Sequence, residues 1–456
     1  MNNRLTINLF FFKMLFCLVA FFFPSYKIFS FIAVFGGFIF LYILYKYLVN
    51  FVLHKKNISI TVFLFSSFFW FWKEFFVLGL TPILYENTAS YSPFYGRQIP
   101  LTILAKSALM ICIFNYLVIF LYSIVPRNTY NFIVTKRNIS NKNTYVDLVL
   151  FFVSTSGWFF LRGVHGSFQS AILGLLDFRT HVVEIEEGFL KYLPIFSIVA
   201  SSFAIFRLSS GAKGNKLLKL TTFILGGTIA VLSGTRFKLI FLLLPFILGI
   251  MLFTNDRFNL KFKIYILSIT TFLLLGLSFF QVFNRYGEGS RSAVDKSISS
   301  STIGSDHFSA LSHAVYLGDN LQSYFKQPSI FIFLTDLIPR FIWPEKPESL
   351  FWDYYNSKIA VGGNVTPSLL GQYYLNWGIL GVFLISINFA LFLSFAEYMV
   401  SYYKKYSNSY YLYISCLLLT FLFLSFRVYS LNYFFYVLVG ILFCFLFTKK
   451  GNAIEK

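Results

Sequence analysis

A series of long apolar stretches constrains this chain more than any other feature. A membrane-spanning helix needs roughly 20 mostly apolar residues, because the lipid interior offers no hydrogen-bond partner to an exposed backbone. About twelve stretches come near this length. Only 12% of the residues are charged and 57% are hydrophobic, too little polar surface for a soluble protein of 456 residues. The sequence therefore predicts an all-α polytopic membrane protein with about 12 transmembrane helices.

The first apolar run is interpreted as a retained helix. Arg4 precedes it, as in a signal peptide, but the segment after Ala20 lacks the closely spaced small residues of a cleavage site. The fifth, sixth and seventh spans are short. The predicted spans are residues 9–23, 28–53, 58–80, 101–124, 146–161, 192–206, 217–232, 237–253, 264–283, 379–402, 410–426 and 433–447.

Basic residues indicate the orientation. With the N-terminus inside, the inner connections carry many lysines and arginines, as short cytoplasmic loops do, and their only acidic residues are Asp147, Asp256 and Glu455. Both termini are therefore predicted to be cytoplasmic. The formal charge of +20 is largely a topology signal, so no nucleic-acid partner is expected.

The chain is predicted to form one integral membrane domain, 1–456, with two sizeable loops on the outer face. The smaller loop covers 162–191 and the larger 284–378. The larger loop has seven basic and eight acidic residues, so its arginines are not part of a general basic coat. Within it, 329–343 is apolar enough for a helix at the membrane interface.

Arginines at the outer helix ends are candidate anion ligands, because a guanidinium presents a planar fork that matches phosphate oxygens. Arg236 ends a tight Ser-Gly-Thr-Arg turn and is therefore fixed between two helices. Arg285 and Arg291 flank two glycines that let an anion approach the backbone. Arg340 follows Pro339 near the headgroup level, and Arg162 lies at a helix end. Arginines that merely reach toward the membrane interface would explain the same positions.

A general base is less well defined by the sequence. His313 and Glu288 are candidates in the large loop, and His307, Asp306 and Asp336 are alternatives. No zinc-protease, nucleotide-binding or clustered His/Cys pattern occurs, so we expect a reaction without metal or cofactor.

Three motifs of the chain resemble the Wzy-type polymerases of O-antigen and capsule repeat units. They are Ser233-Gly234-Thr235-Arg236, Pro339-Arg340 with Trp343-Pro344-Glu345-Lys346-Pro347, and the run from Pro367 through Gln372-Tyr373-Tyr374-Leu375-Asn376-Trp377-Gly378 to Gly381. About a dozen helices with one dominant late outer loop match the family's plan. The motifs cover roughly the C-terminal half.

The resemblance implies a multi-pass glycosyltransferase of the bacterial inner membrane. Its substrate would be an undecaprenyl-pyrophosphate-linked oligosaccharide, and its other partners membrane lipid and a chain-length regulator protein. The growing glycan would be transferred onto a new repeat unit, with Arg236, Arg285 and Arg340 stabilising the departing pyrophosphate. Arg291 would be a fourth cation, and Tyr373, Tyr374 and Trp377 would stack on sugar rings or form an interfacial belt.

Two alternatives remain open. An O-antigen ligase uses the same donor lipid, but His313 lacks the glycine spacing associated with that family. A lipid-linked oligosaccharide flippase would not need a loop of this length, and it would be expected to have more charge deep in the bundle than Lys73, Glu74 and Lys106.

Overall fold

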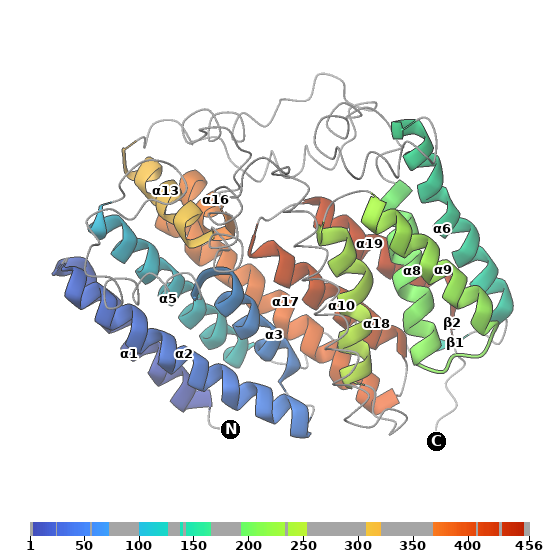
Figure 1. Cartoon of the computed structure of the whole chain (residues 1–456). Coiled ribbons are helices and arrows are strands. Elements are labelled where there is room, and N and C mark those ends of the chain that lie inside the picture. The colour runs from blue at the N-terminus through green and yellow to red at the C-terminus, as the bar shows by residue number, and fades with distance from the viewer. Residues whose placement is uncertain are drawn as a thin grey trace, which may run out of the picture.

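The computed structural model is almost entirely helical, which confirms the predicted class in its coarse form (Figure 1). In the described part there are thirteen α-helices, one π-helical turn and two three-residue strands. That strand pair is an addition to the all-α prediction. The structure describes residues 3–23, 25–54, 57–72, 100–125, 137–139, 143–165, 193–232, 236–252, 307–320, 368–406, 409–427 and 431–450.

The helices follow the predicted apolar stretches closely. Three of them, α2, α5 and α17, contain stretches long and apolar enough to cross a membrane. Several others are apolar but shorter, and the predicted span 264–283 lies outside the described residues. The helices are α1 (Asn3–Phe22), α2 (Tyr26–His54), α3 (Ile58–Ser67), α5 (Leu101–Ile124), α6 (Asn143–His165), α8 (Leu193–Ser209), α9 (Lys216–Leu232), α10 (Arg236–Leu252), α13 (His307–Asn320), α16 (Ser368–Trp377), α17 (Ile379–Tyr406), α18 (Ser409–Ser425) and α19 (Leu431–Leu446).

The predicted span 58–80 is not a uniform helix in its described part. After α3 the chain widens into the π-helical turn η1 (Phe68–Trp72), and residues 73–80 lie outside the described part. An acidic side chain from another helix lies at the N-terminus of α3. Glu397 of α17 accepts a hydrogen bond from the Ser59 N–H at 3.1 Å. The N-terminus of a helix favours an acidic side chain, because the first backbone N–H groups and the positive end of the helix dipole both point toward it.

Hydrogen bonds define two opposite ends of the bundle. At one end the Leu369 N–H of α16 donates to the Phe426 carbonyl just after α18. At the other, β1 (Arg137–Ile139) pairs antiparallel with β2 (Thr448–Lys450), joining the start of α6 to the end of α19. In Figure 1 the first end is uppermost, and the strands are at lower right. Basic connections that the sequence places inside, around Lys213 and Lys404, lie at the strand end.

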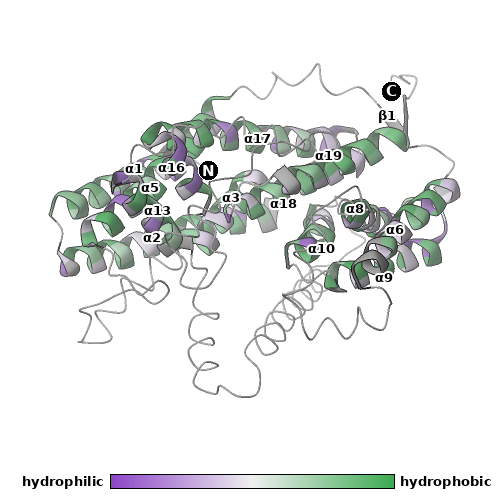
Figure 2. Cartoon of the chain, turned by 90° about the horizontal axis from the view of Figure 1, so that it is seen from above, coloured by the Kyte–Doolittle hydropathy of each residue, from purple (hydrophilic) through white to green (hydrophobic). Residues whose placement is uncertain are grey.

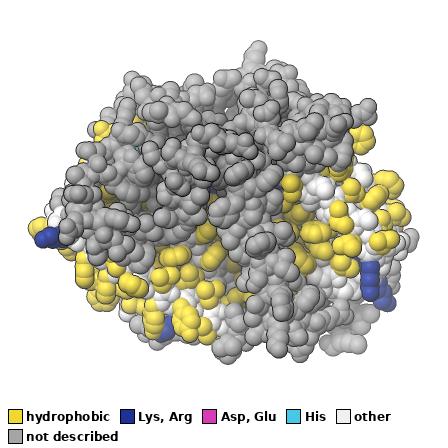
Figure 3. Space-filling model, viewed as in Figure 1, with side chains coloured by type: hydrophobic (Ala, Val, Ile, Leu, Met, Phe, Trp, Pro, Cys, Tyr) yellow, Lys and Arg dark blue, Asp and Glu magenta, His cyan; other side chains and the backbone are white. Residues whose placement is uncertain are grey.

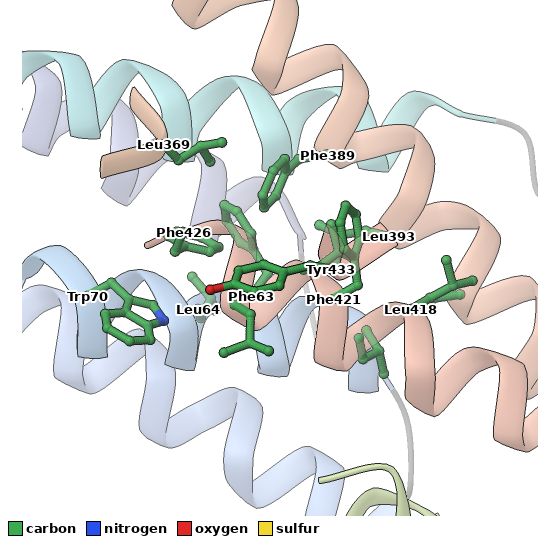
Figure 4. Packing of buried hydrophobic residues seen from close by; sticks show 14 of the residues in the cluster. Phe63, Leu64, Trp70, Leu369, Phe389, Leu393, Leu418, Phe421, Phe426 and Tyr433 are labelled. Carbon is green, nitrogen blue, oxygen red and sulfur yellow. The ribbon is translucent and has the colours of Figure 1, made fainter. Parts of the chain in front are cut away.

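Large rings pack one half of the molecule. Phe63 of α3, Phe114 of α5, Phe389 of α17 and Phe426 are all buried, with neighbouring ring centroids 5.4–5.7 Å apart around the cluster. Figure 4 shows three of these rings together with Trp70, whose indole N–H donates to the Phe423 carbonyl at 2.8 Å. We call α3, α5, α17 and α18 the aromatic region.

Small and hydroxyl-bearing residues pack α6, α8 and α9, which we call the small-residue region. The ribbons of these three helices lie together in Figure 2. Ser154 and Ser201 share a hydrogen bond of 2.8 Å, and Ser201 also donates to the Thr222 carbonyl at 2.7 Å. Ser197 donates to the Ser154 carbonyl at 2.7 Å. Gly226 permits this approach, because a Cβ there would overlap the Ser201 side chain. Close backbones and interhelical hydrogen bonds are typical of helix packing in lipid.

The outer surface of the described helices is apolar. Figure 3 shows hydrophobic side chains across much of the visible described surface, with lysines and arginines at its edges. Among the exposed rings are Phe12, Phe22, Phe31, Phe38 and Phe152. Soluble monomers rarely expose apolar patches of this extent, so this surface is suited to lipid.

Candidate functional site

Two short helices occupy the upper end of the aromatic region (Figure 1). α13 belongs to the long polar stretch, and α16 ends just before α17. α13 packs against α16, α5 and η1. Phe308, Leu311 and Val315 recur at helical spacing on α13 and are buried, which explains why this segment folds as a helix. The sequence analysis predicted no helix there, because the apolar pattern is short and interrupted by polar residues.

An ion pair joins these helices to α5, one of the helices long and apolar enough to cross a membrane. Lys106 of α5 donates to both carboxylate oxygens of Asp319 at the end of α13, at 2.6 Å to Oδ1 and 2.8 Å to Oδ2. The Tyr374 hydroxyl of α16 donates to Oδ1 at 2.6 Å. The Lys106 and Asp319 side chains are each 29% exposed. Three separate helices therefore hold one partly open carboxylate, and we call Lys106, Asp319 and Tyr374 the triad.

Tyr374 is set in place by packing as well as by its hydroxyl. Burial raises the pKa of the Tyr374 phenol, and the hydrogen bond to Asp319 raises it further, so the hydroxyl remains a donor at neutral pH. Gly318 admits the ring: a Cβ at this position would lie 2.9 Å from the Tyr374 Cε1 atom. The residue before Asp319 thus has to be small.

Four predicted site residues lie on α13 and α16, and one of them, Tyr374, belongs to the triad. His313 is on α13 and only 5% exposed, so its side chain faces the packed interior. Tyr373, Tyr374 and Trp377 are all on α16. Tyr373 is half-buried against the hydrophobic core, and Trp377 is partly exposed. Their proposed stacking on sugar rings stays a prediction.

The predicted arginines are described only in part. Arg236 is the first residue of α10, and Arg162 lies near the end of α6, but their side chains are outside the described part. The other predicted residues, Arg285, Glu288, Arg291 and Arg340, lie outside the described residues altogether.

The triad was missed as a unit by the sequence analysis. Lys106 was visible as a lone charge in the span 101–124, and a charge in such a position is a functional candidate by default. Its partner Asp319 is 213 residues away and was one of eight acidic residues in the large loop. No spacing rule connects the two.

A second charged cluster closes the strand end of the small-residue region. Asp147 of α6 accepts from Arg207 Nε at 3.3 Å and from the Asn215 N–H at 3.0 Å. Lys219 Nζ lies 3.7 Å from the same carboxylate and donates to the Ala212 carbonyl at 2.6 Å. All three charged side chains are almost completely buried. Because their hydrogen bonds go to one another, to the α8–α9 loop and to the Tyr410 hydroxyl of α18, we interpret this cluster as a structural clasp.

A third charge was missed entirely. Lys13 of α1 is completely buried, and its amine lies 3.0 Å from the ring centroid of Trp72 and 4.5 Å from that of Phe40. Within the described residues it has no hydrogen-bond partner. The signal was a single lysine in the apolar run 9–23. Its cation–π contacts join α1, α2 and η1.

The described residues contain no group of three or more His, Cys, Asp or Glu side chains that could hold a metal ion. Comparison of the chain with protein-family models, curated proteins and solved structures gives no match.

Proposed function

We propose that the protein is a membrane glycosyltransferase that polymerises lipid-diphosphate-linked oligosaccharide repeat units, in the manner of the Wzy-type polymerases that it resembles. The growing glycan leaves one undecaprenyl-diphosphate carrier and is joined to a sugar hydroxyl on a newly delivered repeat unit. The protein then has about 12 spans, both termini in the cytoplasm and its large loop on the outer face of the bacterial inner membrane.

The anchoring of the long polar stretch is the observation that carries the proposal. Through Asp319, α13 is tied to Lys106 of α5, and through Leu369, α16 is tied to the end of α18. The chain between these helices therefore leaves from and returns to the same end of the bundle. Such an arrangement suits a loop that works on a substrate whose lipid lies in the membrane and whose sugars lie above it.

The chemistry assigned to the arginines follows from the bond that breaks. Cleavage of the anomeric carbon–oxygen bond leaves charge on the diphosphate, and fixed cations stabilise that charge most in the transition state. Arg236, Arg285 and Arg340 are proposed for this role, with Arg291 and Arg162 as further ligands. The backbone adds to the case for Arg236, because it begins α10 and the N-terminus of a helix favours an anion.

A flippase for the same lipid-linked oligosaccharide is the second candidate. One of the two sequence arguments against it was the scarcity of charge deep in the bundle. Lys13 and Glu397 are buried in the described helices, so the bundle contains more charge than that argument allowed. The long anchored stretch still favours polymerisation, since transport alone does not require it.

Deletion of the gene in its host separates these functions. Loss of a polymerase leaves a single repeat unit on the lipid core, loss of a flippase leaves none, and loss of a ligase leaves polymer on its carrier. Gel analysis of the surface glycan distinguishes the three patterns. Unchanged chain length would rule out the proposed polymerase.

Substitution of the arginines tests their proposed role within a working protein. Alanine at Arg236, Arg285 or Arg340 is expected to shorten or abolish the polymer while the protein remains in the membrane. Lys216→Ala is a matched control, because Lys216 is an exposed cation at the strand end of the bundle. Full-length polymer from all three arginine variants would remove them from the diphosphate site.

A further inference from the structure

The Asp319 carboxylate has room for one more hydrogen-bond donor. A carboxylate offers about four acceptor positions on its two oxygens. Oδ1 accepts from Lys106 and Tyr374, whereas Oδ2 accepts only from Lys106 among the described residues. The side chain is 29% exposed, so a donor from outside can reach it. The open position on Oδ2 suits a hydroxyl group.

The same carboxylate is held more firmly than a surface acid. Its partners come from two other helices, α5 and α16, and Gly318 lets the Tyr374 ring close against α13. Fixing a reactive group in advance removes much of the entropic cost of bringing it to a substrate. A solvated surface aspartate would not require hydrogen bonds from two other helices.

An aromatic residue shares the helix face of the carboxylate. Tyr316 precedes Asp319 by three residues on α13 and is 36% exposed, so the two side chains share one helix face. A sugar presents an apolar C–H face to such a ring and hydroxyl groups to a neighbouring carboxylate. The chemistry of this face therefore fits a saccharide.

We infer that Asp319 binds a hydroxyl group of the acceptor sugar through Oδ2 and accepts its proton during glycosyl transfer, an inference that rests on the proposed function. The hydroxyl oxygen forms a bond to the anomeric carbon of the donor glycan. The bond from that carbon to the diphosphate oxygen breaks, and the diphosphate leaves with the electron pair. The hydroxyl proton passes to Asp319.

His313 is less suited to the same task. It lies on α13 as well, but only 5% of its surface is exposed and its side chain packs into the interior. Among the described side chains of α13, Asp319 is therefore the accessible proton acceptor, and Lys106 and Tyr374 act as positioning residues. General acid–base assistance of this kind contributes roughly 100-fold to 10,000-fold in rate.

The test uses full-length protein in detergent with a lipid-diphosphate-linked repeat unit as substrate. Asp319→Asn keeps the shape of the side chain and an oxygen for Tyr374, so the protein is expected to fold with an unchanged unfolding temperature. Its polymerisation rate is expected to fall at least about 100-fold. Asp319→Glu, which keeps the carboxylate, is expected to retain more activity than Asp319→Asn.

A double variant separates catalysis from support of the fold. Asp319→Asn leaves the Lys106 charge unpaired, whereas Lys106→Met combined with Asp319→Asn removes both charges. If Asp319 serves only to neutralise Lys106, the double variant will work as well as Lys106→Met alone. We expect it to stay at least about tenfold slower than Lys106→Met.

Each outcome has a definite meaning. Folded Asp319→Asn with a rate within about tenfold of the wild-type protein would overturn the inference, as would equal rates for Lys106→Met and the double variant. Those results would leave polymerisation by the protein itself intact. If the wild-type protein forms no polymer from the repeat unit, the proposed function fails and the inference fails with it.

Discussion

The aromatic region and the small-residue region differ in the side chains that pack between their helices. In the aromatic region, rings such as Phe63, Phe389 and Phe426 fill the space between helices. In the small-residue region, Gly226 and Ser201 leave so little space that hydroxyl groups reach the backbone of the next helix. Lipid is as apolar as the protein interior, so both regions rely on close contact more than on the hydrophobic effect.

The two regions also differ in what lies at their ends, a partly exposed charged site in one and a buried charged cluster in the other. α13 and α16, which carry Asp319 and Tyr374 of the triad, contact the aromatic region through Lys106 and Phe426. The small-residue region ends in the buried clasp of Asp147, Arg207 and Lys219. Large side chains can be exchanged for others of similar volume, whereas a close approach of two backbones tolerates no added atom. The aromatic region should therefore accept more substitutions than the small-residue region.

The largest expected effect tests the clasp that closes the small-residue region. Asp147→Ala leaves Arg207 and Lys219 buried without their shared anion, and loss of one partner from a buried ion cluster costs about 3–5 kcal/mol. Titration with SDS in mixed micelles measures the free energy of unfolding. Thr144→Ala is the control, since Thr144 is exposed one turn earlier on α6. Equal stability of the two variants would show that the clasp adds nothing.

Two adjacent glycines of α9 test whether close approach holds the region together. A Cβ at Gly226 would overlap Ser201, whereas the nearest atom to a Cβ at Gly227 is Leu242 Cδ2 at 3.8 Å. Gly226→Ala is therefore expected to lower the free energy of unfolding by about 1–3 kcal/mol. Gly227→Ala should be neutral or slightly stabilising, because alanine favours helix. The same titration checks both, and a reversed order would contradict the packing described.

The aromatic region should tolerate a change of side chain that the small-residue region would not. Phe426 is fully buried among Phe63, Phe114 and Phe389, and leucine can fill most of the same space. Phe426→Leu is expected to cost about 1 kcal/mol, well below the 3 kcal/mol or so of Phe426→Ala. Phe383→Leu, at a 42% exposed position of α17, serves as the control. If leucine proved as damaging as alanine, ring geometry rather than volume would govern this region.

The smallest expected effect concerns a single interhelical hydrogen bond. Ser154 and Ser201 share a bond of 2.8 Å, while Ser201 keeps its bond to the Thr222 carbonyl. A double-mutant cycle with Ser154→Ala and Ser201→Ala is expected to give a coupling energy of about 0.6 kcal/mol. A coupling near zero would leave steric fit alone to explain the close packing.

The apolar stretches were predicted well because helices in lipid must satisfy their own backbone hydrogen bonds. The span 101–124 has the same limits as α5, where Pro100 precedes the first helical residue. The π-helical turn after Ser67 and the helix α13 escaped prediction. Both depend on contacts with other segments: η1 packs against α13, and α13 is short and partly polar.

The sequence by itself determined that the chain is a bundle of apolar helices, because composition and run length decide whether a segment can lie in lipid. It also showed that Lys106 is one of the few charged residues within the predicted spans. Only the tertiary structure decided which residue forms an ion pair with Lys106. Asp319 is distant from Lys106 along the chain and is one of several acidic residues in the large loop. The pairing of Lys13 with Trp72 and of Asp147 with Arg207 was decided in the same way. Periodicity is a local property of the chain, whereas partner choice depends on how the helices pack.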